Sequence, residues 1–335
     1  MAQQVTIIGL GLIGGSIGLA LKRWSRENQD ALQVVGFDED MQRQNVAKRM
    51  GAIDSSEWSL SKAVANADIV IVATPVQAMR EVFSDIAEDL QPGTIVTDTG
   101  STKVDVMGWA KELLPTTVSF VGGHPMAGKS ESLEAADAEL FKDATWAICP
   151  AVNASEDSIR NVLGIVSATG AESFFVDPVE HDSYVAGVSH LPFVAAISLI
   201  NAVTDDNAWR DMRTLASSGL KDTSRLALGS PEMHRDIALT NRDAIIRWID
   251  RYVEELQAVR GELESGGDDT AKALFERFER AQDERAKLEI PVHRTDEVTT
   301  PSQRELAREG VGDQMQRMFF GGFRRRKRDD DKNGR

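Results

Sequence analysis

In the first half of this chain, four polar side chains follow short apolar segments, at positions where strands of a sheet would end. They are Thr74, Asp98, Ser101 and His124. Histidine titrates near neutral pH, so His124 is the natural general base of this set. A lone histidine is more often structural. His124, however, stands between a double glycine and a proline just after an apolar segment, which favours a role in proton transfer.

A glycine-rich segment near the N-terminus predicts how a nucleotide would be held. Residues 9–14 fit G-x-G-x-x-G and follow the apolar, β-branched residues 5–8. In this motif Gly9 permits a tight turn, Gly11 lets a pyrophosphate approach the backbone, and Gly14 lets the helix pack on the strand. The start of the helix offers N–H groups and a partial positive charge to phosphates. The predicted cofactor contacts are Gly9, Gly11, Leu12, Ile13, Gly14, Thr74 and Pro75.

An acidic residue follows at the expected place and predicts which dinucleotide is bound. The apolar residues 32–37 end at Asp38, close to the roughly 20-residue offset after the glycines at which a carboxylate binds the ribose 2′-hydroxyl. A carboxylate there repels a 2′-phosphate, so we predict NAD over NADP. The alternative is a glycine-rich turn in an unrelated strand–helix–strand unit, which the combination of strand, spacing and acid disfavours.

Composition limits the partners of the chain. Its 53 acidic and 38 basic residues give a net charge of −15, which disfavours binding to nucleic acid or to an anionic membrane. We therefore expect a small-molecule substrate. An anionic substrate would have to be attracted by a few well-placed basic groups.

The sequence also predicts the compartment. We find no apolar stretch that approaches the roughly 18 residues of a membrane span, and no charged segment precedes the first apolar run. We therefore expect a cytoplasmic protein with no membrane contact. Cys149, the only cysteine, lies in an apolar run and is interpreted as a small buried hydrophobe, and we assign no metal site.

The order of apolar segments predicts two domains and a tail. Residues 1–177 alternate short apolar segments with helical patterns, which is typical of an α/β domain with a doubly wound, mostly parallel sheet. Residues 178–290 show only helical patterns. Within them, residues 180–203 form one long helix with an irregularity at Pro192, too apolar for a surface helix and suited to a domain core or dimer interface. The predicted strands are residues 5–8, 32–37, 68–73, 94–98, 118–121, 145–149 and 172–176.

The last segment, residues 291–335, is polar and ends in the basic run 324–328. We expect a disordered, solvated tail. The alternative is a contact for an acidic partner or a neighbouring subunit, because three phenylalanines precede the basic run.

The helical region contributes further candidate residues. His181 and Ser189 stand eight positions apart, which places them roughly on one face of a helix. Arg225 could clamp a carboxylate through two parallel hydrogen bonds. Arg235 and Arg242 are rivals, and periodicity alone does not choose among the three arginines.

Taken together, these motifs resemble the prephenate/arogenate dehydrogenase family of tyrosine biosynthesis. The resemblance covers about residues 4–290, and the order and spacing of its short motifs make it specific. The matching segments are residues 9–16, 73–76, 98–103, 122–128, 181–182, 189–192, 222–225 and 231–236.

The resemblance implies a Rossmann-type domain followed by an all-helical domain that forms a homodimer. It also implies oxidative decarboxylation of prephenate to 4-hydroxyphenylpyruvate with reduction of NAD. In that reaction His124 takes the proton of the ring 4-hydroxyl and Ser101 supports this hydroxyl. Arg225 binds a substrate carboxylate, while His181 and Ser189 line the pocket.

The sequence departs from the family at several positions. Phe193 stands where members often have His, and His234 stands where they often have Trp. Ser130 occupies the usual place of a Glu, with Glu131 one position later. These changes bear on the contacts of the substrate side chain and on feedback inhibition.

Three alternatives stay open. Arogenate could replace prephenate as the substrate. Another β-hydroxyacid or imine dehydrogenase of similar build would rely on a lysine in the helical domain, for which Lys221 is the obvious candidate. A non-catalytic, dimeric NAD sensor is the third alternative, although such a protein needs neither His124 nor Ser101.

Overall fold

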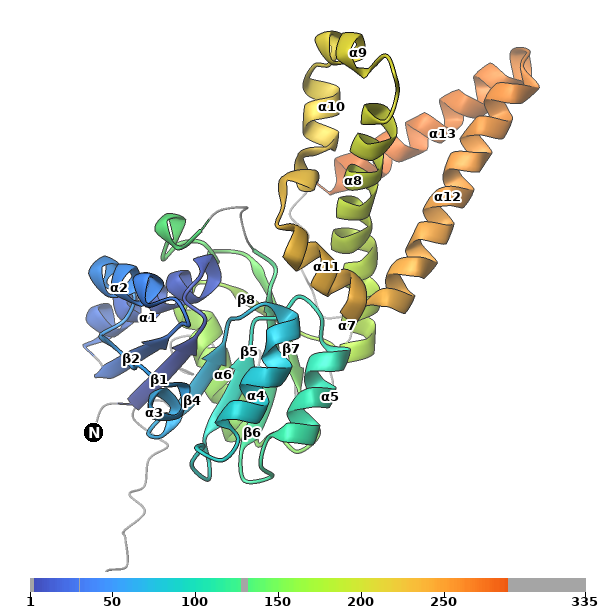
Figure 1. Ribbon diagram of the computed structural model, residues 1–335. Coiled ribbons are helices and arrows are strands. Elements are labelled where there is room, and N and C mark those ends of the chain that lie inside the picture. The colour runs from blue at the N-terminus through green and yellow to red at the C-terminus, as the bar shows by residue number, and fades with distance from the viewer. Residues whose placement is uncertain (1–2, 30, 128–131, 289–335) are drawn as a thin grey trace, which may run out of the picture. The chain divides into compact units, whose positions relative to one another are not determined.

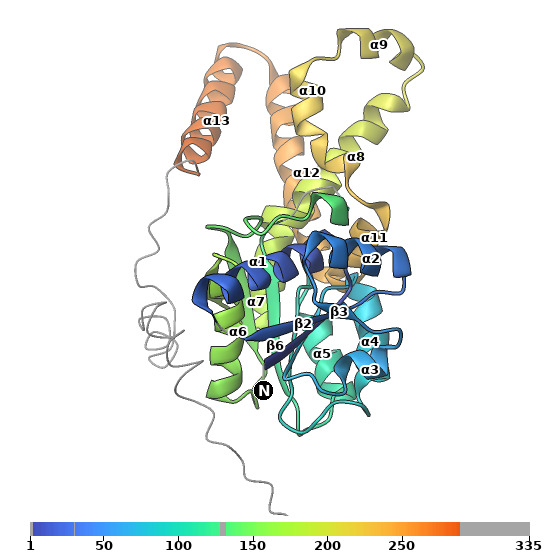
Figure 2. The same cartoon turned by 90° about the vertical axis from the view of Figure 1, so that its left-hand side faces the viewer.

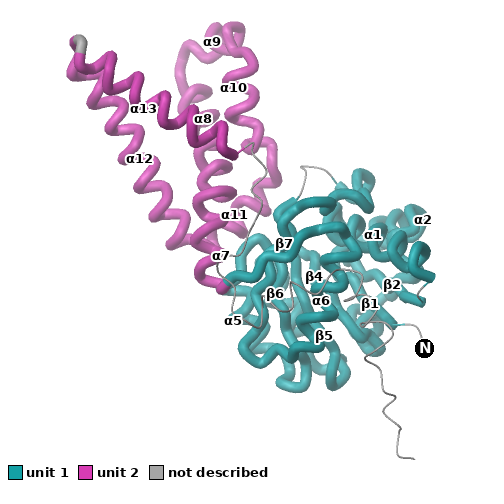
Figure 3. The backbone as a smooth tube through the Cα atoms, turned by 180° about the vertical axis from the view of Figure 1, so that it is seen from behind, with its two compact units in different colours: residues 1–176, 301–335 teal, residues 177–300 magenta. Residues whose placement is uncertain are grey.

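A computed structural model of the chain describes residues 3–29, 31–127 and 132–288 (Figure 1). The chain divides into two compact units, with the division after Val176 (Figure 3). The first unit is an α/β domain and the second is helical, so the predicted fold class is confirmed. The predicted tail, residues 291–335, lies outside the described residues.

The first unit is built on one eight-stranded sheet with the order β3-β2-β1-β4-β5-β6-β7-β8. All neighbouring strands run parallel except β6 and β7, which are antiparallel. Every predicted strand is present, and the short edge strand β3 was not predicted. The strands are β1 (Gln3–Ile8), β2 (Leu32–Phe37), β3 (Ser55–Ser56), β4 (Ile69–Val72), β5 (Ile95–Asp98), β6 (Ser119–Pro125), β7 (Thr145–Pro150) and β8 (Glu172–Phe175).

Helices cover both faces of this sheet. Helices α1 and α6 lie on one face, and α3, α4 and α5 lie on the other (Figure 2). The short α3 was not predicted. The helices are α1 (Leu12–Asn28), α2 (Met41–Met50), α3 (Leu60–Val64), α4 (Met79–Ile86), α5 (Val104–Leu113) and α6 (Glu156–Ala168), with the 3₁₀ turns η1 (Val76–Ala78) and η2 (Leu133–Ala135).

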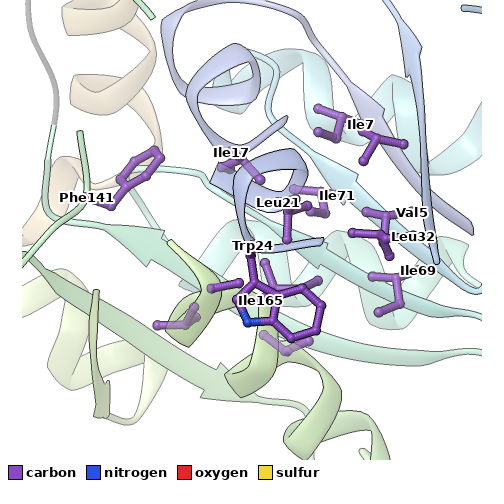
Figure 4. Close-up of a cluster of buried hydrophobic side chains, with 14 of the residues drawn as sticks. Val5, Ile7, Ile17, Leu21, Trp24, Leu32, Ile69, Ile71, Phe141 and Ile165 are labelled. Atoms are coloured by element: carbon purple, nitrogen blue, oxygen red, sulfur yellow. The ribbon is translucent and has the colours of Figure 1, made fainter. Parts of the chain in front are cut away.

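Alternation along the strands divides the core into two layers. Ile7 belongs to the layer beneath α1 and α6, whereas its neighbour Ile8 belongs to the layer beneath α4 and α5. Successive side chains of a strand point to opposite faces, so a sheet covered on both faces needs continuous apolar runs. Figure 4 shows the first layer, in which Trp24 of α1 lies beside Ile165 of α6. Cys149 of β7 is fully buried, as predicted.

The second unit is all helical within the described residues. Its helices are α7 (Pro178–Val185), the π-helical turn η3 (Ala186–His190), α8 (Leu191–Thr204), α9 (Trp209–Leu215), α10 (Ser218–Thr223), the 3₁₀ turn η4 (Arg225–Leu228), α11 (Pro231–Thr240), α12 (Arg242–Ser265) and α13 (Asp268–Lys287). The predicted irregularity at Pro192 is the turn η3, which ends just before it. Proline has no N–H to donate and disturbs the preceding turn of a helix, which accounts for the wider π turn here.

The expectation that no apolar stretch approaches the length of a membrane span is wrong. Residues Pro178–Thr204 form a continuous helical segment of 27 residues that is long and apolar enough to span a membrane by length and composition. The prediction of one long, apolar helix over residues 180–203 is confirmed, and this length is why the segment meets the criterion. Because helices of soluble proteins meet the same criterion, it is weak evidence for a membrane. Only 28% of its most apolar window is buried, which leaves an apolar face to be covered.

Candidate functional site

The glycine-rich loop between β1 and α1 has the geometry that the motif predicts. Gly9 has a φ of +92°, and a Cβ there would lie 2.6 Å from the carbonyl oxygen of Ala73. A Cβ at Gly14 would overlap the carbonyl oxygen of Gly9. A Cβ at Gly11 would meet nothing within 4 Å. The loop is therefore packed tightly on the protein side and has room at Gly11 for a bound phosphate.

The start of α1 and the end of β4 offer unused hydrogen-bonding groups beside this loop. Gly11 is the N-cap of α1 and has no side chain with which to cap the first N–H groups of the helix. The hydroxyl of Thr74 is buried and finds no hydrogen-bond partner among the residues that the structure describes. The next residue, Pro75, begins the turn into η1. Unsatisfied donors and a buried hydroxyl at this edge fit a dinucleotide better than an empty surface.

Asp38 closes the loop from the end of β2. Its side chain is almost fully buried, and one carboxylate oxygen accepts a hydrogen bond from the backbone N–H of Leu10 at 2.8 Å. The other oxygen accepts from the backbone N–H of Asp40 at 2.9 Å. The guanidinium of Arg43 lies 3.8 Å from the carboxylate. A carboxylate fixed in this way keeps a negative charge next to the loop.

Asp98, the last residue of β5, has a different environment from the one predicted. We expected its carboxylate among the side chains at the edge of the sheet, but it is fully buried and paired with the buried ammonium of Lys103. It also accepts hydrogen bonds from the backbone N–H groups of Gly100, at 2.7 Å, and Gly123, at 3.1 Å. Asp98 is therefore engaged by protein groups. No pattern in the sequence predicts that Lys103 is buried.

His124 lies within β6 and not in a loop after it. It pairs with Ala147 of the antiparallel strand β7, and 8% of it is exposed. Ser101 is half-buried in the segment between β5 and α5. The strands β4, β5 and β6 are parallel neighbours, so their carboxyl ends lie at the same edge of the sheet. Thr74 and Ser101 follow β4 and β5 there, and His124 is the next-to-last residue of β6. This edge also carries the glycine loop, at the end of β1.

In the second unit, two of the predicted residues fall in or beside a buried polar cluster. The Nδ1 of His181 lies 2.7 Å from the carboxylate of Asp182. The side-chain amide of Asn241 donates to the backbone oxygen of Asp182 at 2.7 Å and lies 3.2 Å from Nδ1 of His190. Ser189 stands next to His190 in the π-helical turn and is half-buried.

The cluster keeps His190 uncharged. Burial lowers the pKa of the His190 imidazole to about 4, although the Asp182 carboxylate acts in the opposite direction. Since Asn241 donates to Nδ1, the proton of the neutral ring resides on Nε2. That atom is buried and has no partner in the described part of the chain. Sequence reasoning missed His190 and Asn241 as members of this cluster because neither has a periodic signature.

Arg225 begins η4 and is exposed, and none of the ion pairs among the described residues involves it. Its rival Arg235 is paired with Asp236 at 2.7 Å. Phe193 and His234, the two aromatic residues that differ from the family pattern, are in contact. Their rings stack with centroids 4.3 Å apart. Ser130 and Glu131 lie outside the described residues.

Models of two protein domains match the chain. The model described as "Prephenate dehydrogenase, nucleotide-binding domain" matches residues 17–175, and the one described as "Prephenate dehydrogenase, dimerization domain" matches residues 177–279. Together the two models cover most of the chain. The first falls on the α/β unit and the second on the helical unit.

Named relatives agree with these models. A prephenate dehydrogenase of Bacillus subtilis (strain 168) is 33% identical over 293 residues, which are 87% of this chain and 77% of the relative. A cyclohexadienyl dehydrogenase of Zymomonas mobilis is 29% identical and is covered to 96% of its length, with 85% of this chain aligned.

Two solved structures share the fold along nearly their whole length. The prephenate dehydrogenase from A. aeolicus, in complex with hydroxyphenyl propionate and NAD+, superposes with a TM-score of 0.79 at 25% identity, over 86% of this chain and 99% of that one. The Synechocystis arogenate dehydrogenase superposes with a TM-score of 0.72 at 25% identity, over 85% of this chain and 100% of that one.

Proposed function

Because this chain belongs to the prephenate dehydrogenase family and is an NAD-dependent dehydrogenase, we propose that prephenate is its preferred substrate and that His124 carries the proton transfer. The reaction is the oxidative decarboxylation of prephenate to 4-hydroxyphenylpyruvate. The observation that supports these assignments most is that Ser101 follows β5 and His124 lies near the end of the adjacent strand β6, at the edge of the sheet that carries the glycine loop.

The proposed chemistry needs one proton acceptor. His124 takes the proton from the ring 4-hydroxyl, and Ser101 hydrogen-bonds the same oxygen and orients it. Bound NAD supplies the acceptor for the hydride that leaves the ring carbon bearing this oxygen. Loss of carbon dioxide then makes the ring aromatic, which drives the reaction forward. The work of the protein is mainly orientation of the ring, which can account for a large part of a rate enhancement.

Residues of the first unit are proposed to hold the cofactor. Gly9, Gly11 and Gly14 let the pyrophosphate approach the start of α1, where Leu12 and Ile13 lie. Asp38 accepts hydrogen bonds from the ribose. Thr74 and Pro75 contact the cofactor from the end of β4. The buried hydroxyl of Thr74 and the space at Gly11 support this assignment.

Residues of the second unit are proposed to bind the substrate. Arg225 binds a substrate carboxylate, since its guanidinium is exposed and prephenate carries two negative charges. In a chain of net charge −15, a focused cation is needed to attract such a substrate. His181 and Ser189 are proposed to line the pocket around the ring.

We further propose that residues 1–177 and 178–290 are the two domains, that the protein is a homodimer, and that it works in the cytoplasm. Only 28% of the most apolar window of Pro178–Thr204 is buried in the single chain, and the segment lies in the region that matches a dimerisation domain. Contact with a second copy would cover this face. A membrane is the competing explanation, and size measurement in the absence of detergent separates the two.

One assay tests the proposal. The purified protein is offered prephenate or arogenate, each with NAD or NADP, and the absorbance of the reduced nicotinamide is followed. We expect the highest kcat/KM with prephenate and NAD. A higher kcat/KM with arogenate would reassign the substrate within the family. Reduction with a 3-hydroxyacid and not with either diene would favour the β-hydroxyacid alternative, and a test of Lys221 would then follow.

A further inference from the structure

We propose that the buried ion pair of Asp98 and Lys103 positions Ser101 and His124 relative to each other. The inference rests on the proposed function, which assigns proton transfer to His124. Asp98 and Lys103 touch neither the cofactor nor the ring in this proposal. They act through the backbone on either side of the reacting groups.

One carboxylate connects the two segments that carry these groups. One oxygen of Asp98 accepts the N–H of Gly100, the residue before Ser101, and also pairs with Lys103, two residues after Ser101. The other oxygen accepts the N–H of Gly123, the residue before His124. Loss of this carboxylate would therefore let Ser101 and His124 move independently of each other.

Lys103, the second member of the pair, supplies the opposite charge that allows the Asp98 carboxylate to be buried. Lys103 is the N-cap residue of α5, and the Asp98 and Lys103 side chains are both 0% exposed. The two opposite charges are in contact, so each offsets part of the cost of burying the other. The carboxylate then presents one oxygen to the N–H of Gly100 and the other to the N–H of Gly123. Without it, these buried backbone N–H groups would lose their partners.

Stability alone gives no reason for this arrangement. Two charges must lose their hydration to enter the protein interior, and a well-packed apolar pair of similar volume is often equally stable or more stable. What an apolar pair cannot provide is an acceptor for two backbone N–H groups, one in the segment after β5 and one in β6. The ion pair therefore fixes the relative positions of Ser101 and His124. Its removal should lower kcat by more than the loss of stability explains.

The test compares Lys103→Met, Asp98→Asn and the double variant Asp98→Asn/Lys103→Met. Each single variant leaves an unpaired buried charge or an unpaired polar group, so its melting temperature falls. The double variant removes both charges, and we expect its melting temperature to return toward that of the wild type. We expect its kcat to stay roughly 10²-fold low, because the Asn amide replaces one of the two acceptor oxygens with a donor. The dissociation constant of NAD should stay unchanged, since the glycine loop is intact.

Asp54→Asn is the matched control. Asp54 also pairs with a lysine, Lys22 at 2.6 Å, and accepts a backbone N–H, that of Val34 at 2.8 Å. It lies beside β2, away from the ends of β5 and β6. We expect its kcat to equal that of the wild type.

A second measurement asks whether Asp98 acts through His124. If it does, Asp98→Asn should add less than about threefold to the loss of kcat caused by His124→Asn. If the losses of kcat from Asp98→Asn and His124→Asn multiply when the two are combined, the inference is overturned. A wild-type kcat in the double variant Asp98→Asn/Lys103→Met would overturn it as well. Normal turnover in His124→Asn would instead overturn the proposed function, so the two failures are distinguishable.

Discussion

The carboxylate of Asp38 accepts a hydrogen bond from the backbone N–H of Leu10 at 2.8 Å. Leu10 lies between the first two glycines of the loop, so this bond ties the end of β2 to the predicted phosphate site. Each carboxylate oxygen has more than one acceptor position. Asp38 can therefore hold the loop and still accept a hydrogen bond from a ribose hydroxyl.

The first prediction concerns cofactor choice. Asp38→Ser removes the negative charge that repels a 2′-phosphate, while Arg43, 3.8 Å from the carboxylate, remains. We expect the ratio of kcat/KM with NADP to kcat/KM with NAD to rise by roughly tenfold or more, which corresponds to about 1.4 kcal/mol. Steady-state kinetics with both cofactors measures the ratio.

Asp40→Ser is the matched control for this variant. Asp40 also lies near Arg43, at 4.0 Å, but its side chain caps α2 through the N–H of Gln42. We expect little change in its cofactor preference. If Asp38→Ser leaves the preference unchanged as well, Asp38 does not face the ribose.

The second prediction concerns the proton acceptor. His124→Asn keeps a polar side chain of similar size in β6 but removes the base. We expect kcat to fall by roughly 10²–10⁴-fold, the usual contribution of a general base. The affinity for NAD, measured by titration without substrate, should stay near normal. A variant with normal turnover would exclude His124 from the mechanism.

The third prediction concerns the substrate clamp. Arg225→Ala should mainly raise the KM for prephenate, because an exposed guanidinium on η4 would no longer bind a carboxylate. Arg160→Ala makes the same change in net charge on α6, where Arg160 pairs with Asp157 at 2.7 Å. We expect no change of KM in this control. If the KM of Arg225→Ala also stays constant, Arg235 or Arg242 becomes the candidate.

Local sequence patterns predicted most of the first unit. Continuous β-branched runs such as residues 69–72 are typical of strands buried on both faces, and all seven predicted strands are present. The edge strand β3 was missed because Ser55 and Ser56 have no apolar pattern and form only a short bridge to β2. The domain boundary and the roles of the site residues stay predictions.

Contacts between distant segments were beyond what patterns can show. Asp98 looked like a polar residue at the end of a strand, and only the fold brings the N–H of Gly123 to its carboxylate. The sequence separation between Asn241 and His190 likewise hides their contact at 3.2 Å. In both cases the partner is chosen by tertiary packing, on which propensity and periodicity carry no information.

The fourth prediction concerns the glycine before His124. A Cβ at Gly123 would lie 2.6 Å from the carbonyl oxygen of Asp98 and 2.8 Å from Nε1 of Trp146. Backbone cannot yield as a flexible side chain does, so Gly123→Ala should displace β6 and lower both the melting temperature and kcat.

Gly108→Ala is the control, because a Cβ there meets nothing within 4 Å. An alanine in the exposed interior of α5 should stabilise the protein by about 0.5–1 kcal/mol. Equal melting temperatures in the two variants would contradict the predicted crowding at Gly123.

The fifth prediction follows from the buried imidazole of His190. Burial lowers its folded-state pKa from 6.5 to about 4, so between these values the unfolded chain binds more protons at this residue than the folded chain. Stability therefore rises with pH across this window and is lost as the pH falls from 6.5 toward 4. A shift of this size corresponds to a loss on the order of 3 kcal/mol.

His190→Gln should remove this part of the pH dependence, because a glutamine amide stays neutral and can still accept a hydrogen bond from Asn241. Urea unfolding of both proteins at pH 7 and pH 4, at one fixed protein concentration, measures the difference. We expect the free energy of unfolding of the wild type to fall further than that of the variant over this range. If the free energy of unfolding falls equally in the two proteins, His190 does not have a lowered pKa in the folded chain. Its burial and the hydrogen bond that its Nδ1 atom accepts from Asn241 argue against that outcome.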